Sequence, residues 1–155
     1  MKLAFFSALF LLVSTIPTFG QANKSAEALT VRNYKDLPIV VENVNTNSFG
    51  ITRDAIKTRT ELRVRSSGLR PIEGDGTQWV YVQVNVVGVG YAIKVSFRRK
   101  VFWYRLDGSI TSDIGSVWET GSTGTTTNAG YVMESLDQIL DKFLNAYLKA
   151  NQDSK

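Results

Sequence analysis

The stretch Gln78-Trp-Val-Tyr-Val-Gln-Val-Asn-Val-Val87 alternates valine with aromatic or polar residues. A period of two is typical of a β-strand that buries one face and exposes the other. Gly88-Val89 follows, and glycine at the first central position favours a two-residue type II′ turn. A hairpin closed there places Val84 opposite Ile93 and Val80 opposite Phe97, so the apolar sides of residues 78–87 and 90–106 coincide. A slip of one residue would separate these sides, which strongly favours this register.

A second hairpin is predicted at Asp107-Gly108, a dipeptide typical of tight turns. A two-residue turn there places Phe97 opposite Trp118 and Val101 opposite Ile114. The weak point is Arg99, which this register puts on the apolar side. A bulge near Arg98-Arg99 is the alternative, and it would reverse the faces of all residues after it.

The segments outside the hairpins read as two helices and two short strands. Residues 37–44 form a β-branched run, and residues 69–73 form a short strand that Pro71 assigns to a sheet edge. Between them, Thr52 is a good helix N-cap and Gly68 a good left-handed C′ residue. Three residues at helical spacing predict its buried stripe: Ile56, Thr60 and Val64.

A second helix begins after Thr127 or Asn128, with an apolar stripe running from Val132 to Tyr147. The order β-α-β-β-β-β-α predicts an α+β fold. We expect a single antiparallel-rich sheet with both helices packed on its valine face. The other face of the sheet should be open.

The amino terminus predicts export. Lys2 precedes an apolar run over residues 3–16, which is too short to span a bilayer, and small residues follow Pro17. Residues 1–22 are therefore interpreted as a signal peptide, cleaved after Gly20 or Ala22, with an uncleaved anchor as the alternative. We expect a flexible leader at 23–36, a single domain at 37–150 and a polar tail at 151–155. The mature chain should be periplasmic or extracellular, with no membrane span.

Composition removes several classes of chemistry. The 155 residues include 18 basic and 14 acidic side chains, giving a net charge of +4, and no cysteine or histidine. Disulfides, thiolate nucleophiles, imidazole bases and Cys- or His-ligated zinc are thereby excluded. We expect no catalytic residues, no metal ligands and no cofactor.

The open sheet face is the candidate binding site, because aromatic and basic residues gather there. Rings give flat apolar contact, and cations pair with phosphates or carboxylates. We expect Trp79 to stand opposite Arg98 in a cation–π contact. The expected partner is an envelope protein or an anionic glycan or glycolipid; an ordinary solvated face, or a homodimer through this face, is the alternative. The candidate residues are Trp79, Tyr81, Lys94, Arg98, Lys100, Phe102 and Tyr104.

A small hydrolase or transferase is the alternative function. It would use a carboxylate and the Gly/Thr-rich loop 121–130, in a pocket enclosing Glu119 or Asp113 near residues 123–126. The loop lacks the Gly-Lys-Ser/Thr ending of a P-loop, and no two carboxylates are placed together as acid–base work requires. A surface pair of Glu119 with Lys94 or Arg98 is therefore favoured over catalysis. Nucleic acid is disfavoured because no RNA-binding motif is present and the chain is predicted to be exported.

The chain resembles a family of small, uncharacterised exported bacterial proteins. The resemblance is carried by the valine-rich hairpins and by Trp118-Glu-Thr-Gly121 before a Gly/Thr/Asn-rich turn and a C-terminal helix. Its topology is also similar to that of the lipopolysaccharide-assembly lipoprotein and of the N-terminal domain of the Tol-system propeller protein. The chain lacks the lipidated cysteine of the former. The resemblance implies a cell-envelope role through binding rather than catalysis.

Overall fold

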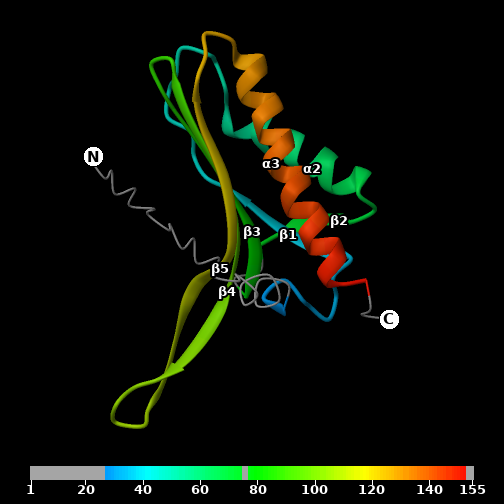
Figure 1. Cartoon of the computed structure of the whole chain (residues 1–155), viewed down its shortest axis with the longest axis vertical. Coiled ribbons are helices and arrows are strands. Elements are labelled where there is room, and N and C mark those ends of the chain that lie inside the picture. The colour runs from blue at the N-terminus through cyan, green and yellow to red at the C-terminus, as the bar shows by residue number, and fades with distance from the viewer. Residues whose placement is uncertain (1–26, 75–76, 153–155) are drawn as a thin grey trace, which may run out of the picture.

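The computed structural model describes residues 27–74 and 77–152, so the predicted signal peptide lies outside the described residues. The elements in chain order are β1 (Asp36–Val41), α2 (Arg53–Ser66), β2 (Arg70–Glu73), β3 (Gln78–Val87), β4 (Gly90–Tyr104), β5 (Ile110–Thr125) and α3 (Ala129–Ala150). The strands form one sheet in the order β2-β1-β3-β4-β5, and both helices cover the same face (Figure 1). The expected α+β fold is confirmed.

The sheet is mixed rather than uniformly antiparallel. β1 is parallel to both β2 and β3, whereas β3, β4 and β5 pair as antiparallel hairpins. The connection from β1 to β2 passes through α2, which returns the chain to the same end of the sheet and so makes the pair parallel. β2 lies at the sheet edge, as Pro71 predicted.

Helix α2 begins and ends at the expected residues. The Thr52 hydroxyl accepts a hydrogen bond from the Ala55 N–H at 3.2 Å. At the other end Gly68 has φ +77°, its N–H donates to the Arg65 carbonyl, and the Leu69 N–H donates to the Val64 carbonyl. These two bonds define a Schellman motif, and they satisfy carbonyls that the helix leaves unpaired.

The first hairpin has the predicted register. Val84 lies opposite Ile93 and Val80 opposite Phe97, and all four side chains are buried. Gly88 has φ +58°, while no described residue other than glycine has a positive φ. Positive φ at the first central residue alone is the signature of a type II′ turn.

In the second hairpin, one of the two predicted residue pairs is wrong: the pairing differs from the prediction near the turn. The loop comprises residues 106–108, because Gly108 takes the left-handed conformation and the Arg105 N–H donates to the Ser109 carbonyl. A two-residue type I′ turn would require positive φ at both Asp107 and Gly108, but of these two residues only Gly108 has a positive φ. Val101 therefore lies opposite Asp113, not Ile114.

Farther from the turn, a β-bulge restores the predicted register between β4 and β5. Phe97 lies opposite Trp118 as expected, but Arg98 lies opposite Ser116, so Val117 is the extra residue on β5. The bulge is on β5, and Arg99 of β4 stays on the core side. It does so at the end of the core, where its Nη1 donates to the Ala28 carbonyl at 3.1 Å.

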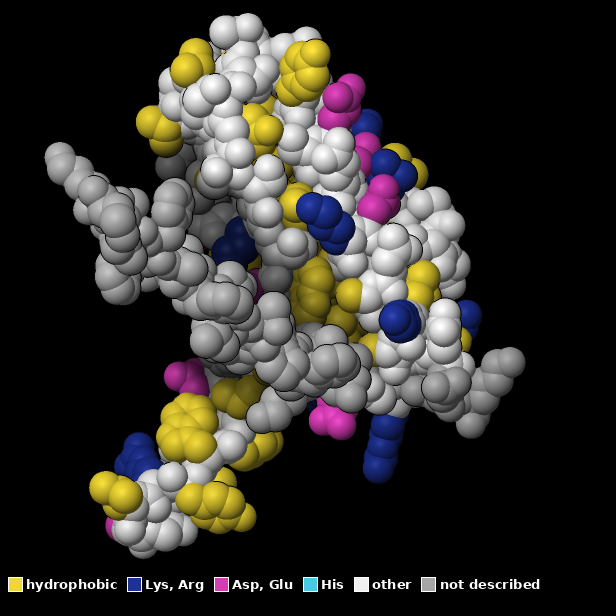
Figure 2. Space-filling view, viewed as in Figure 1, with side chains coloured by type: hydrophobic (Ala, Val, Ile, Leu, Met, Phe, Trp, Pro, Cys, Tyr) yellow, Lys and Arg dark blue, Asp and Glu magenta, His cyan; other side chains and the backbone are white. Residues whose placement is uncertain are grey.

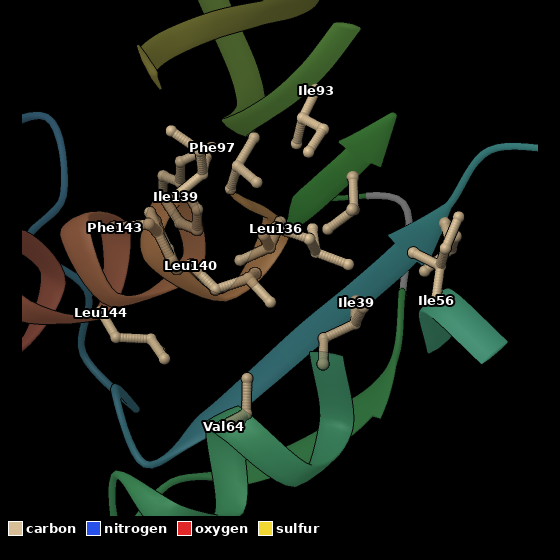
Figure 3. Packing of buried hydrophobic residues seen from close by; sticks show 14 of the residues in the cluster. Ile39, Ile56, Val64, Ile93, Phe97, Leu136, Ile139, Leu140, Phe143 and Leu144 are labelled. Atoms are coloured by element: carbon tan, nitrogen blue, oxygen red, sulfur yellow. The ribbon is translucent and has the colours of Figure 1, made fainter. Parts of the chain in front are cut away.

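The core lies between the valine face and the two helices (Figure 3). Four aromatic rings form its centre under α3. Phe143 lies 6.3 Å from Phe97, 5.3 Å from Trp118 and 5.6 Å from Tyr147, measured between ring centroids. Burial raises the pKa of the Tyr147 hydroxyl, which donates to the Tyr34 carbonyl. This cluster fixes α3 against β4 and β5.

The segment before β1 is part of the packed structure where it is described. Leu29 and Val31 belong to the buried core, although residues 23–36 were expected to be a flexible leader. Asn151, expected in the polar tail, is fully buried. Its amide accepts from the Val31 N–H and donates to the Leu29 and Tyr147 carbonyls. One side chain therefore joins the start of the described chain to the end of α3.

Asp137 of α3 joins the two helices electrostatically. Its carboxylate accepts from Arg59 Nε at 2.9 Å and lies 3.2 Å from Arg63 Nη2, both on α2. Burial disfavours ionisation, but the hydrogen bonds from the two guanidinium groups outweigh it and hold the pKa of Asp137 below its usual value. The charged carboxylate is therefore stabilised in the folded state.

This lowered pKa predicts an acid dependence of stability. A carboxyl group with a lower pKa when folded contributes stability above its unfolded pKa of about 3.9 and loses it as the pH falls through the folded value. We expect the free energy of unfolding to fall as the pH is lowered from about 5, and to fall less steeply in Asp137→Asn. Urea titrations across this range measure both slopes. Asp113→Asn, at an exposed carboxylate, is the control; parallel curves for Asp137→Asn and the parent would contradict the prediction.

Candidate binding face

The sheet face opposite the helices places side chains from three adjacent strands together. Val40 of β1 lies beside Tyr81 of β3, which lies opposite Ser96 of β4. Glu42, just after β1, has the same parity as Val40 and so belongs to the same face. Trp79 lies opposite Arg98 in the next row, as predicted.

The guanidinium of Arg98 stacks on Tyr81, not on Trp79. Its central carbon lies 3.7 Å from the centroid of the Tyr81 ring. The expected contact with Trp79 is therefore corrected to a diagonal one, which long side chains reach across an antiparallel pair. Ser96, the residue directly opposite Tyr81, is too small to cover the ring and leaves space for the guanidinium.

The hydroxyl group of Tyr81 has its own partner, Glu42. Burial and a hydrogen bond with Glu42 raise the pKa of Tyr81. Tyr81 is thereby fixed by Glu42 at its hydroxyl and by Arg98 at its ring. Because a stacked guanidinium keeps its N–H groups in one plane, Arg98 is oriented to bind a carboxylate or phosphate with two hydrogen bonds.

Three buried polar atoms on this face have no hydrogen-bond partner among the described residues: Glu42 Oε2, Trp79 Nε1 and Ser96 Oγ. Buried polar groups in folded proteins are almost always paired, so each exception needs an explanation. The three atoms come from β3, β4 and the end of β1, and they surround the Tyr81–Arg98 stack. We call these five residues, Glu42, Trp79, Tyr81, Ser96 and Arg98, the stack site.

An open depression of about 450 Å³ adjoins the stack site. Its walls carry the amides of Gln83 and Asn85 and the ion pair Lys94–Glu119, whose N···O distance is 2.8 Å. Its floor is low because Gly121 has no side chain; a Cβ there would lie 2.6 Å from the Ile93 carbonyl oxygen. Amide and hydroxyl groups lining an open floor suit a ligand rich in hydroxyl groups.

Glu119 pairs with Lys94, as the sequence predicted. The hydrogen bond from Lys94 is the main cause that lowers the pKa of Glu119, and the carboxylate is exposed. A general acid needs a raised pKa, so this environment opposes that role. Asp113 does not line the depression; it lies opposite Val101, and its carboxylate accepts from the N–H of Ile114.

The seven predicted binding residues lie in two separate regions of the sheet. Trp79, Tyr81, Lys94 and Arg98 lie over the body of the sheet, whereas Lys100, Phe102 and Tyr104 lie beyond the last pair of β3 with β4. Residues 100–114 form a two-stranded ribbon that extends past every other element (Figure 1), and we call it the arm. Lys100 lies 5.6 Å from the centroid of Phe102.

Two residues of the stack site, Glu42 and Ser96, were not found from the sequence. Glu42 and Ser96 carry no motif, because their role depends on the pairing of β1 with β3 and of β3 with β4. Their parity within each strand was the only available signal. Gln83 and Asn85 were assigned to the correct face but not to a depression, since a depression requires the small floor residues of β4 and β5.

The Gly/Thr-rich loop is shorter than expected. Residues 121–125 continue β5 and pair with β4, and Asn128 caps α3 by accepting from the Gly130 N–H at 2.7 Å. Within residues 27–74 and 77–152, no cluster of acidic side chains has the geometry of a metal site. In the same part of the chain, no helix combines the length and apolar character needed to cross a bilayer.

No family model and no curated protein matches the chain. Similar solved structures include a PelC dodecamer from Paraburkholderia phytofirmans, with 12% identity, a TM-score of 0.39, and coverage of 74% of this chain and 87% of that one. A minor lipoprotein from Acinetobacter baumannii has 12% identity, a TM-score of 0.30, and coverage of 77% and 94%. A Xanthomonas campestris protein of family model DUF330 has 8% identity, a TM-score of 0.32, and coverage of 77% and 82%. At these scores the matches establish neither family nor function, and the expected resemblance to the lipopolysaccharide-assembly lipoprotein stays a prediction.

Proposed function

We propose that this protein is an exported, non-catalytic domain of the bacterial cell envelope that binds an anionic glycan or glycolipid headgroup at the stack site. The observation that carries the proposal is the oriented guanidinium of Arg98 on Tyr81, surrounded by three unpaired polar atoms. Export is the prediction from residues 1–22 of the sequence.

The unpaired atoms favour a hydroxylated ligand. Glu42 Oε2 needs a donor, Trp79 Nε1 needs an acceptor, and Ser96 Oγ can serve as either. Sugar hydroxyl groups both donate and accept, so they match the needs of all three atoms once a sugar enters between the side chains that bury them. The adjoining amides of Gln83 and Asn85 extend the same chemistry along the sheet.

The charge on this face favours an anion. Lys94 is neutralised by Glu119, but no carboxylate among the described residues forms an ion pair with Arg98. A carboxylate or phosphate on the ligand would supply that partner. An anionic sugar joins both requirements in one molecule, whereas a simple anion would leave Glu42 Oε2 without a donor.

Removing the guanidinium tests the proposal. We expect Arg98→Ala to weaken binding of an anionic oligosaccharide, such as an oligogalacturonate, or of a phosphorylated glycolipid in vesicles by about 10- to 100-fold, since a hydrogen bond to a charged group contributes about 1.5–3 kcal/mol. The thermal midpoint should change little, because Arg98 lies outside the core. Isothermal titration calorimetry measures the affinity.

Lys142→Ala removes one exposed charge from α3 and is the matched control. Neutral dextran should bind weakly to every variant. Equal affinity of Arg98→Ala and the parent would refute the role of the stack site. A parent that binds none of these glycans but captures an envelope protein would refute the ligand class.

A further inference from the structure

The arm presents an apolar face that the β5 bulge assembles. With Val117 as the extra residue, Ile110 lies opposite Tyr104 and Ile114 opposite Lys100, on the same side as Phe102. Without the bulge and the loop at 106–108, both isoleucines would fall on the other side. Phe102, Tyr104 and Ile110 are 66%, 78% and 62% exposed, and Leu106 at the tip is fully exposed. Figure 2 shows hydrophobic side chains on the arm, at the free end of the molecule.

The arm also has a free strand edge. The Lys100 N–H donates to the Thr77 carbonyl, whereas the Arg105 N–H donates to Ser109 across the hairpin. Even-numbered residues of β4 therefore direct their backbone groups toward the β3 side. β3 begins at Gln78, opposite Arg99, so no described strand pairs with Phe102 or Tyr104 on that side. Natural proteins cover or block such edges, because an open edge is a template for another strand.

We propose that the arm pairs with the arm of a second copy of this chain, edge to edge and antiparallel, about a two-fold axis at Trp103. In this register Phe102 of one copy lies opposite Tyr104 of the other, and each pair exchanges two backbone hydrogen bonds. All free N–H and C=O groups of Phe102 and Tyr104 are then used in both copies. The two Trp103 residues face each other as a non-hydrogen-bonded pair, in which side chains approach most closely.

The side chains of the arm suit this partner. Phe102 and Tyr104 form aromatic cross-strand pairs on the apolar face, a stabilising combination. The register brings the tip of one arm, with Asp107, to the base of the other, where Arg99 and Lys100 lie. No like charges stand opposite each other. A self-complementary patch of this kind is what a two-fold interface requires.

The area of the arm predicts a reversible dimer. An aromatic side chain buries about 150–250 Å² when fully covered, but Phe102, Trp103 and Tyr104 are only 66%, 44% and 78% exposed, so the three rings offer roughly 280–470 Å² per copy. A standard interface buries about 800 Å² per partner. The arm therefore offers less area than a standard interface needs, so the dimer should be weak and should depend on concentration. Lipid is the less suitable occupant, because hydrogen bonds from Ser109 lower the pKa of Asp107 and keep a carboxylate charged at the tip.

Single cysteines test the register, because the chain contains none. We expect Trp103→Cys to form a disulfide-linked dimer under mild oxidation at least tenfold faster than Val87→Cys, although Val87, at the end of the other hairpin, is the more exposed position (83% against 44%). Cross-strand cysteines at a non-hydrogen-bonded pair lie within disulfide distance. Non-reducing electrophoresis gives the rates. Equal rates for the two variants would overturn the proposed pairing.

Sedimentation velocity tests the free edge in the protein without cysteine. The parent should shift toward twice the monomer mass as concentration rises, and Phe102→Pro should stay monomeric, because proline removes an N–H that the hairpin itself does not use. Phe102→Ala keeps that N–H and should retain more dimer than Phe102→Pro. Arg98→Ala should dimerise like the parent, which separates this proposal from the glycan site. A parent that is monomeric at all concentrations, or that binds phospholipid vesicles through the arm instead, would overturn the proposal.

Discussion

Replacing Phe143 with alanine is expected to lower the free energy of unfolding by about 3–5 kcal/mol, the usual cost of removing a buried phenyl ring. Phe143 is completely buried, and its ring contacts Phe97 of β4, Trp118 of β5 and Tyr147 of α3. The lost energy has two parts, the transfer of the ring from water and the cavity it leaves. Domains of this kind are stable by only about 5–15 kcal/mol, so the effect is a large fraction of the total.

Urea denaturation followed by tryptophan fluorescence measures this loss, and Trp118 reports directly on the cavity. Tyr131→Ala removes an exposed aromatic ring from the first turn of the same helix and should change stability by less than about 0.5 kcal/mol. If the two substitutions had the same effect, the aromatic cluster would not be what holds α3 on the sheet.

Replacing Asn151 with alanine is expected to cost about 2–4 kcal/mol, although it removes only one small polar group. The amide makes three hydrogen bonds, to Val31, Leu29 and Tyr147, and it has no access to water. Truncation leaves the backbone groups of residues 29 and 31 buried without partners, and each such group costs about 1–3 kcal/mol.

The loss should be local as well as global. Hydrogen exchange of residues 27–35 should become faster than that of the central strands, because Asn151 is their link to α3. Gln152→Ala, at the exposed neighbouring position, is the matched control. Unchanged exchange in residues 27–35 would show that Leu29 and Val31 hold the segment by apolar packing alone.

The fold was predictable where the signal was local and repeated. The valine alternation of residues 78–87 determined which face of β3 is buried, and the Gly88 turn determined how β3 meets β4. The caps of α2 were equally local, since Thr52 and Gly68 act on backbone groups within one turn. Such features need no knowledge of distant residues.

For the candidate site, the sequence predicted which side of the sheet the residues share, but not which of them contact one another. Parity placed Trp79, Tyr81, Lys94 and Arg98 on the same side of the sheet, and the structure keeps them there. The partner of Arg98 was not predictable, because a flexible side chain can reach a residue directly opposite or a diagonal one. The small Ser96 and the neighbouring β1, with Glu42, decided in favour of Tyr81.

The amino-acid sequence by itself determined the element order, the buried face of the central hairpin and the helix ends, because periodicity, turn residues and caps act over a few positions. Only the tertiary structure decided the bulge at Val117, the burial of Leu29 and Asn151, and the separation of the stack site from the arm. These depend on contacts between residues far apart in the chain, where one extra residue in β5 moves Ile110 and Ile114 to the other side of the sheet. Local pattern therefore specified which residues could share a face, and packing selected which of them meet.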